Sequence, residues 1–76
     1  MTQEDWRDIF ASNLADNMRE HRMSQNRLAR EAGLSASRIN DYLNRRAVPS
    51  IFAVINLAYA LDVDVDSLVD FGECIY

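Results

Sequence analysis

Residues 24–44 constrain the fold more strongly than any other part of this chain of 76 residues. Two helices that cross steeply through a turn of about three or four residues need a small residue at the crossing, a turn residue tolerant of positive φ, and apolar anchors in the second helix. Ala29 and Gly33 meet the first two needs, and Ile39 and Tyr42 are the anchors. This spacing predicts two short helices joined by a tight turn.

Capping residues and hydrophobic periodicity predict three further helices, which gives an all-α fold of five helices without strands. The predicted segments are Thr2 to about His21, Ser24 to Gly33, Ser35 to about Asn44, Pro49 to Leu61, and Asp64 to Phe71. The apolar side chains expected to pack inside are Trp6, Ile9, Phe10, Leu14, Met18, Leu28, Ala29, Ala32, Leu34, Ile39, Tyr42, Leu43, Val54, Leu57, Ala58, Leu61, Leu68 and Phe71. A chain of this length is expected to form one compact domain, residues 1–76.

Several short motifs carry a resemblance to a known family. They are Met-Ser-Gln-Asn-Arg-Leu-Ala from Met23, Ala-Gly-Leu-Ser across the turn, Ile39 in the third helix, Pro-Ser from Pro49, and Leu-Ala-Tyr-Ala-Leu-Asp-Val-Asp-Val-Asp-Ser-Leu from Leu57. From about Leu14 to Val69 the chain resembles the Cro and phage-repressor family of helix-turn-helix proteins, also called the XRE family. The resemblance implies a lambda-repressor-like fold that binds double-stranded DNA sequence-specifically. It also implies a third helix in the major groove and a homodimer on a palindromic operator.

The same resemblance implies which residues face the DNA. Gln25 matches a position that commonly binds a phosphate and braces the third helix. Ala36, Ser37 and Asp41 match positions that face base edges, and Asn44 matches one near the DNA backbone.

Helix geometry leads to nearly the same surface. A helix turns by about 100° per residue, so four polar side chains fall about 120° to 160° away from the inward-facing Ile39: Ser37, Asp41, Asn44 and Arg45. Arg38 and Asn40 flank this strip, Ser35 is an N-cap that can also reach a phosphate, and Arg45 and Arg46 are candidate phosphate clamps. The candidate DNA-binding set is Gln25, Ser35, Ala36, Ser37, Arg38, Asn40, Asp41, Asn44, Arg45 and Arg46. For each residue the alternative is a solvated surface side chain, and for Arg38 it is an ion pair with Asp41 or Glu31.

Two positions depart from the family's pattern. Many relatives have Gln or Arg at the position of Ala36, which can offer only a methyl contact to thymine, so direct base readout is expected to be lean. Arg45 or Arg46 stands where the family usually has Gly after the third helix, so this loop can differ. The fold is expected to survive both changes, whereas the family's base preference does not transfer.

The net charge of −4 argues at first against a nucleic-acid partner. The distribution of charge reverses that interpretation. Residues 19–46 hold seven arginines and three acidic residues, a net charge of +4, whereas the remainder holds one arginine and nine acidic residues, a net charge of −8. A basic middle between acidic ends is compatible with phosphate binding, although ordinary solvated helix faces would give the same pattern.

Several classes of protein are excluded by composition. Cys74 is the single cysteine and His21 the single histidine, so neither a disulfide nor a four-ligand zinc site is expected. No nucleophile at a matched spacing accompanies His21, so neither an enzyme nor a cofactor is expected. No apolar run approaches the roughly 20 residues that span a bilayer, and the acidic start is unlike a signal peptide. We expect a cytoplasmic protein with no membrane partner.

The leading interpretation is a Cro-like repressor that binds DNA as a homodimer. The chain ends soon after the fifth helix, so no ligand-sensing domain and no small-molecule ligand are expected. Phe71, Ile75 and Tyr76 follow a chain already well supplied with core residues, and we expect this tail and the fifth helix to form the dimer interface. Local packing of the tail is the alternative. A different class of function is a protein-interaction adaptor that keeps the fold, which the net negative charge and Ala36 favour.

Overall fold

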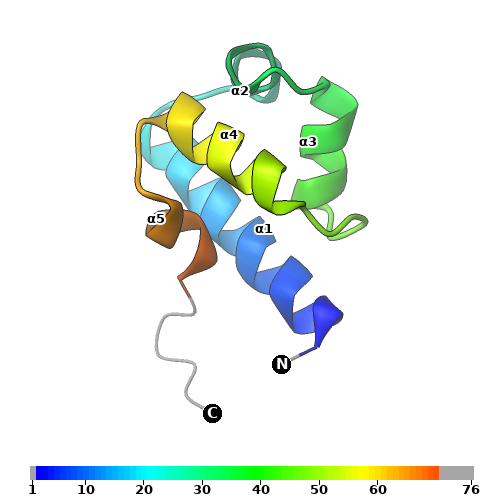
Figure 1. The fold of residues 1–76 in the computed structure, drawn as a ribbon. Coiled ribbons are helices and arrows are strands. Elements are labelled where there is room, and N and C mark those ends of the chain that lie inside the picture. Colours follow the sequence, from blue (N-terminus) through cyan, green and yellow to red (C-terminus); the bar gives the residue numbers. More distant parts are fainter. Residues whose placement is uncertain (1, 71–76) are drawn as a thin grey trace.

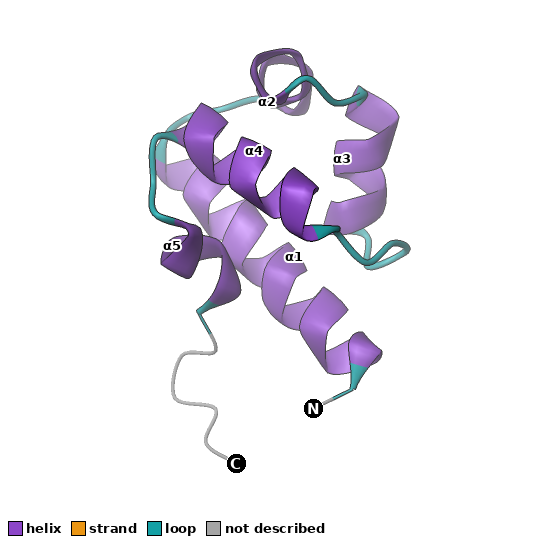
Figure 2. Ribbon diagram, viewed as in Figure 1, coloured by secondary structure: helices purple, strands orange, loops and turns teal. Residues whose placement is uncertain are grey.

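A computed structural model describes residues 2–70. These residues form five helices and no strand, as the sequence predicts: α1 (Gln3–Glu20), α2 (Gln25–Ala32), α3 (Ala36–Leu43), α4 (Ile51–Leu61) and α5 (Val65–Val69). Figure 1 shows α4 crossing in front of α1, with α2 above them and α3 to one side. The connections between the helices are short loops (Figure 2).

Capping residues set the starts of the first four helices. Thr2 and Asp5 form the predicted capping box: the Thr2 Oγ1 accepts from the Asp5 N–H at 3.1 Å, and the Asp5 carboxylate accepts from the Thr2 N–H at 3.0 Å. The backbone and side-chain hydrogen bonds from Thr2 lower the pKa of the Asp5 carboxyl. Ser24, Ser35 and Ser50 each accept from the backbone N–H three residues later. Local side-chain chemistry therefore decides where these helices begin.

The fifth helix differs from the prediction in two respects. Asp64 occupies its N-cap position, but the side chain makes no capping hydrogen bond. The helix ends at Val69, and Asp70 is extended with φ −67° and ψ 120°. Phe71, which was expected to continue the helix, lies outside the described residues, as does the tail that was expected at the dimer interface.

Two asparagines on α1 hold the C-terminal end of α5. The Asn13 amide donates to the carbonyl oxygens of Leu68 at 3.1 Å and Asp70 at 2.8 Å. The buried Asn17 donates to the carbonyl oxygens of Asn13 at 2.8 Å and Ser67 at 3.4 Å. The last carbonyl groups of a helix have no hydrogen-bond partner inside it. The two asparagines supply donors to these carbonyl groups and so attach α5 to α1.

The core is formed by apolar side chains from all five helices. α2 packs against α3 and α4, α1 packs against α3 and α5, and α4 packs against α5. The core residues are Phe10, Leu14, Met18, Leu28, Ala29, Ala32, Ile39, Tyr42, Ala53, Val54, Leu57, Ala58, Leu61 and Leu68. This set confirms most of the predicted core and adds Ala53. Four predicted residues, Trp6, Ile9, Leu34 and Leu43, are only partly buried, and Phe71 lies outside the described residues.

Four helices end on a residue in the left-handed conformation, namely Arg22, Gly33, Arg45 and Asp62, with φ of 52°, 72°, 60° and 58°. In each case the next residue donates its N–H to a carbonyl five positions back in the chain, as Leu34 does to Ala29 at 2.8 Å. This is the Schellman arrangement, which strongly favours glycine at the left-handed position. Three of the four positions nevertheless hold Arg or Asp, so these ends contain backbone strain.

Replacing Gly33 with Ala should isolate the cost of this conformation. A Cβ at Gly33 would meet no atom within 4 Å, so the only penalty is the positive φ. We expect Gly33→Ala to lower the free energy of unfolding by about 1 to 2 kcal/mol. The reverse change at the equivalent end of α1, Arg22→Gly, should not lower it. Urea denaturation of both variants checks this, and equal losses in both would contradict it.

Candidate nucleic-acid interface

The outer face of α3 has the polarity that helix geometry predicts. Ile39 is fully buried, and Tyr42 is nearly so. Ser37 and Arg38 are exposed near the start of the helix, whereas Asp41 is half-buried. Asn44, Arg45 and Arg46 are exposed at its end. The short helix therefore presents a continuous polar surface while its inner face belongs to the core.

Tyr42 fixes the rotation of α3 relative to α1. Its ring meets Phe10 edge to face, with ring centroids 5.7 Å apart and planes at 88°. Burial raises the pKa of the Tyr42 hydroxyl, and the nearby Arg38 guanidinium opposes this only in part. A tyrosine hydroxyl is neutral at physiological pH in any case, and the raised pKa keeps it so, which suits its place in the core.

Asn40 is the centre of a hydrogen-bond network across the helix-turn-helix. Its Nδ2 donates to the Gln25 Oε1 at the start of α2, a long bond of 3.5 Å. Its Oδ1 accepts from Arg46 Nη2 at 2.7 Å and from Asn44 Nδ2 at 3.2 Å. Sequence reasoning placed Asn40 only on the flank of the candidate surface. The structure shows that it links three other candidate residues.

The arginines of the candidate surface differ in how far they are already paired. Arg46 contacts the Asp41 carboxylate at 3.1 Å, and Asp41 thus shares its oxygens with a neighbour. Glu31 is paired with Arg27 at 2.8 Å. Among the described residues neither Asp41 nor Glu31 forms an ion pair with Arg38. The structure therefore does not contain the ion pair that was the alternative to a DNA contact for Arg38. Its exposed guanidinium is available to a ligand.

Arg45 adopts the backbone conformation that a glycine would adopt. With φ 60° it is the left-handed residue after α3, and the Arg46 N–H closes the turn on the Asp41 carbonyl at 2.8 Å. The loop therefore keeps the geometry that glycine favours, although the sequence lacks glycine here. The Arg45 Nε also meets the Asp8 Oδ1 on α1 at 2.9 Å. Sequence reasoning missed Asp8, because no local pattern relates positions so far apart in the chain.

The remaining candidates lie at the starts of α2 and α3. The Ser35 hydroxyl caps α3 by accepting from the Arg38 N–H at 3.1 Å. Ala36 is the first residue of α3 and is half-buried, as is Gln25, the first residue of α2. The fold thus gathers all ten candidates on α3, its flanking turns and the start of α2.

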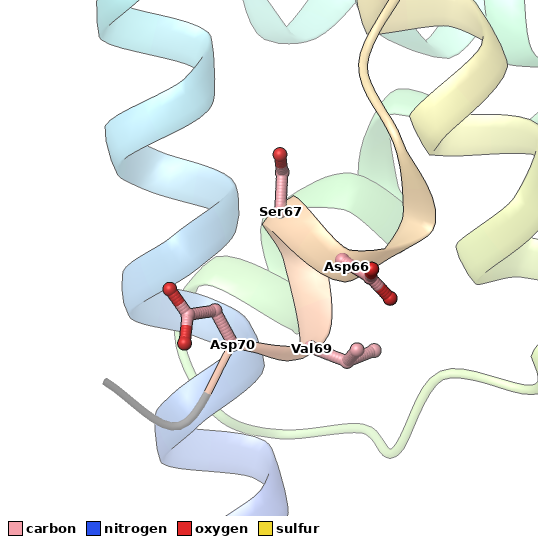
Figure 3. A pocket seen from close by; sticks show the side chains of 4 residues that line it. All are labelled: Asp66, Ser67, Val69 and Asp70. Carbon is pink, nitrogen blue, oxygen red and sulfur yellow. The ribbon is translucent and has the colours of Figure 1, made fainter. Parts of the chain in front are cut away.

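The described residues contain no comparable second site. A shallow depression of about 360 Å³ beside α5 is lined by Asp66, Ser67, Val69 and Asp70 (Figure 3). The polar groups of its lining point in different directions instead of converging. No group of three potential metal ligands occurs within residues 2–70. None of the helices formed by these residues could span a membrane.

Comparison with known proteins agrees with this geometry. The sequence matches the family described as Helix-turn-helix over residues 14–68, which include all of α2, α3 and α4. The chain belongs to this helix-turn-helix family. The match confirms the resemblance to the Cro and phage-repressor type that the motifs indicate.

The helix-turn-helix chain also resembles a solved structure, described as a hypothetical transcription factor, NHTF, from Neisseria. The TM-score is 0.81 at 25% identity, and the alignment covers 91% of this chain and 79% of the other. No curated protein matches the sequence. The family and this neighbour together indicate a DNA-binding regulator of transcription and not an enzyme.

The Asn40 network predicts a measurable contribution to stability. Asn40→Ala removes partners from Gln25, Asn44 and Arg46, whereas Ser37→Ala changes an exposed residue of the same helix. Both substitutions gain similar helix propensity, so the comparison isolates the hydrogen bonds. We expect Asn40→Ala to be less stable than Ser37→Ala by about 1 kcal/mol in urea denaturation. Equal stabilities would mean that the network contributes nothing.

Proposed function

We propose that the protein is a Cro-like repressor, which binds a palindromic operator as a homodimer with α3 in the major groove. The observation that carries the proposal is the outer face of α3, where Ser37 and Arg38 are exposed and Arg38 forms no ion pair within residues 2–70, while the opposite face is buried in the core. A side chain held on a rigid helix can read base edges without a large ordering cost. The protein would act in the cytoplasm.

Within this proposal the candidate residues divide by chemistry. Base edges are contacted from the start and outer face of α3 by Ala36, Ser37, Arg38 and Asp41. Phosphates are contacted from the surrounding turns and helix ends by Gln25, Ser35, Asn44, Arg45 and Arg46. Asn40 acts as a positioning residue, because its amide is already occupied by Gln25, Asn44 and Arg46.

Two copies are proposed because one short recognition helix reads too few base pairs. Two helices related by a two-fold axis can enter the major groove one DNA turn, about 34 Å, apart. A palindromic site mirrors that symmetry. Selection of bound duplexes from a random DNA pool tests the proposal directly. An enriched palindrome is expected, and the absence of any enrichment at low salt would overturn it.

Arg38 should set base preference through its guanidinium. A bidentate contact to guanine is available to Arg but not to Lys, which keeps only the positive charge. We expect Arg38→Lys to keep most of the affinity for random duplexes but to lose roughly 1 to 3 kcal/mol of discrimination at one symmetric pair of positions. Competition binding with single-base operator variants measures this. If Arg38→Lys keeps the full preference, Arg38 contacts only the backbone.

Asp8 should weaken DNA binding because it competes with phosphate for Arg45. The pair is exposed, so losing it should cost little stability. Asp8→Asn is expected to tighten binding by up to about fivefold, since an exposed ion pair is worth about 1 kcal/mol at most. Asp16→Asn is the matched control, because Asp16 also lies on α1 and pairs with Arg19. Titration of operator DNA with both variants should show the larger gain for Asp8→Asn, and equal gains would indicate only the change in net charge.

A protein-interaction adaptor remains a second candidate because of the net charge of −4 and the pairing of Arg45 and Arg46 with carboxylates. Such an adaptor would bind a protein through the same fold and would show no preference for any duplex. The selection experiment separates the two candidates.

A further inference from the structure

One face of α4 exposes a row of large apolar side chains. Successive residues of a helix are separated by about 100°, which places Ile51, Phe52, Ile55 and Tyr59 within an arc of about 100°. Their exposed fractions are 69%, 70%, 49% and 87%. Val48, 41% exposed, precedes them in the loop before α4. We call these five residues the α4 face.

The opposite side of α4 already fills the core. Ala53, Val54, Leu57, Ala58 and Leu61 are all buried. A helix that is apolar on all sides is normally covered on all sides. In Figure 1 α4 lies across the front of the molecule, and none of the other helices is drawn in front of it. The α4 face therefore lacks a cover within residues 2–70.

The α4 face carries no charge. No acidic or basic residue occurs between Arg46 and Asp62, whereas the other four helices all carry charged residues. A two-fold interface brings the same patch of both copies together, so charges on it would repel or require exact pairing. An uncharged face lets two chains of net charge −4 approach, but it offers no complementary charge to a strongly charged partner.

The size of the α4 face also suits a small dimer. A fully buried aromatic side chain covers about 150–250 Å², so the exposed parts of Phe52 and Tyr59 amount to roughly 300 Å². With the three aliphatic residues the face reaches roughly 500 Å², and two copies reach about 1,000 Å², near the lower limit for a specific interface. Single exposed apolar residues are ordinary, whereas the largest continuous apolar patch of a monomer covers about 300–600 Å² and often has a function.

We propose that a second copy of this chain covers the α4 face in a two-fold dimer. This inference deepens the proposed function, since it names the contact that holds two recognition helices at a fixed separation. The loop of residues 44–50 joins α3 directly to α4, so an α4 pair would constrain both copies of α3. The α4 face thus replaces the C-terminal tail as the expected dimer interface. The alternative to be tested is that the tail holds the two copies together.

Sedimentation velocity over a range of concentrations, without DNA, tests this inference on the full chain. The variant Phe52→Glu/Tyr59→Glu should dimerise roughly 100-fold more weakly than the unaltered chain, because aromatic residues near an interface centre carry most of its affinity. Its helical circular dichroism should be unchanged, since both side chains are largely exposed. The matched control, Gln3→Glu/Ser12→Glu, adds the same charge at exposed positions of α1 and should dimerise normally.

A tail variant, Ile75→Glu/Tyr76→Glu, separates the two occupants. It should dimerise like the unaltered chain. If it becomes monomeric while Phe52→Glu/Tyr59→Glu remains dimeric, the tail forms the interface and the inference is overturned. A chain that stays monomeric up to about 1 mM overturns it too. Sedimentation is measured without DNA, so it can establish the dimer even if duplex selection finds no preferred sequence. Duplex selection can likewise establish DNA binding even if the α4 face forms no dimer.

Discussion

The burial of Ile39 and Tyr42 is the interaction on which the candidate DNA-binding surface depends. α3 has only 8 residues, and isolated helices shorter than about 12 residues are marginal in water. Packing of these two side chains, including the edge-to-face contact of Tyr42 with Phe10, must therefore hold the helix in place. The same packing fixes the rotation of α3 about its axis. Ser37 and Arg38 face outward because the opposite side of the helix is packed in the core.

The electrostatics of the surface reconcile an acidic protein with a DNA partner. Asp8 and Asp41 lie within 3.1 Å of arginine nitrogens that the proposed function assigns to phosphates. Such exposed pairs are weak, so phosphate can displace them at little cost. They neutralise the positive charge of Arg45 and Arg46 locally in the free protein, whereas Arg38, on the outer face of α3, forms no ion pair within residues 2–70. In the proposed function, phosphate contact and base preference thus fall to different arginines.

α3 and α4 are both buried on one side and exposed on the other, but their exposed sides differ in chemistry. Each buries one side in the core, but α3 presents polar and charged groups on its other side, whereas α4 presents only uncharged residues. The short loop between them contains Arg45 in a left-handed conformation, which ends α3 sharply and directs the chain into α4. An α4 pair would therefore transmit the geometry of the proposed dimer to both copies of α3 through this loop.

The sequence by itself determined the five helices of residues 2–70, the approximate limits of the first four and the identity of most core residues. Caps such as Ser35 and apolar periodicity act within a few residues, so they can be read locally. It also identified the outer face of α3, because that face follows from the position of Ile39. Only the tertiary structure decided which distant groups meet: Arg45 with Asp8, Asn13 with the carbonyls of α5, and Asn40 with Gln25. It also decided which side of the wholly uncharged α4 stays exposed, since that depends on where the other helices pack and not on any pattern within α4.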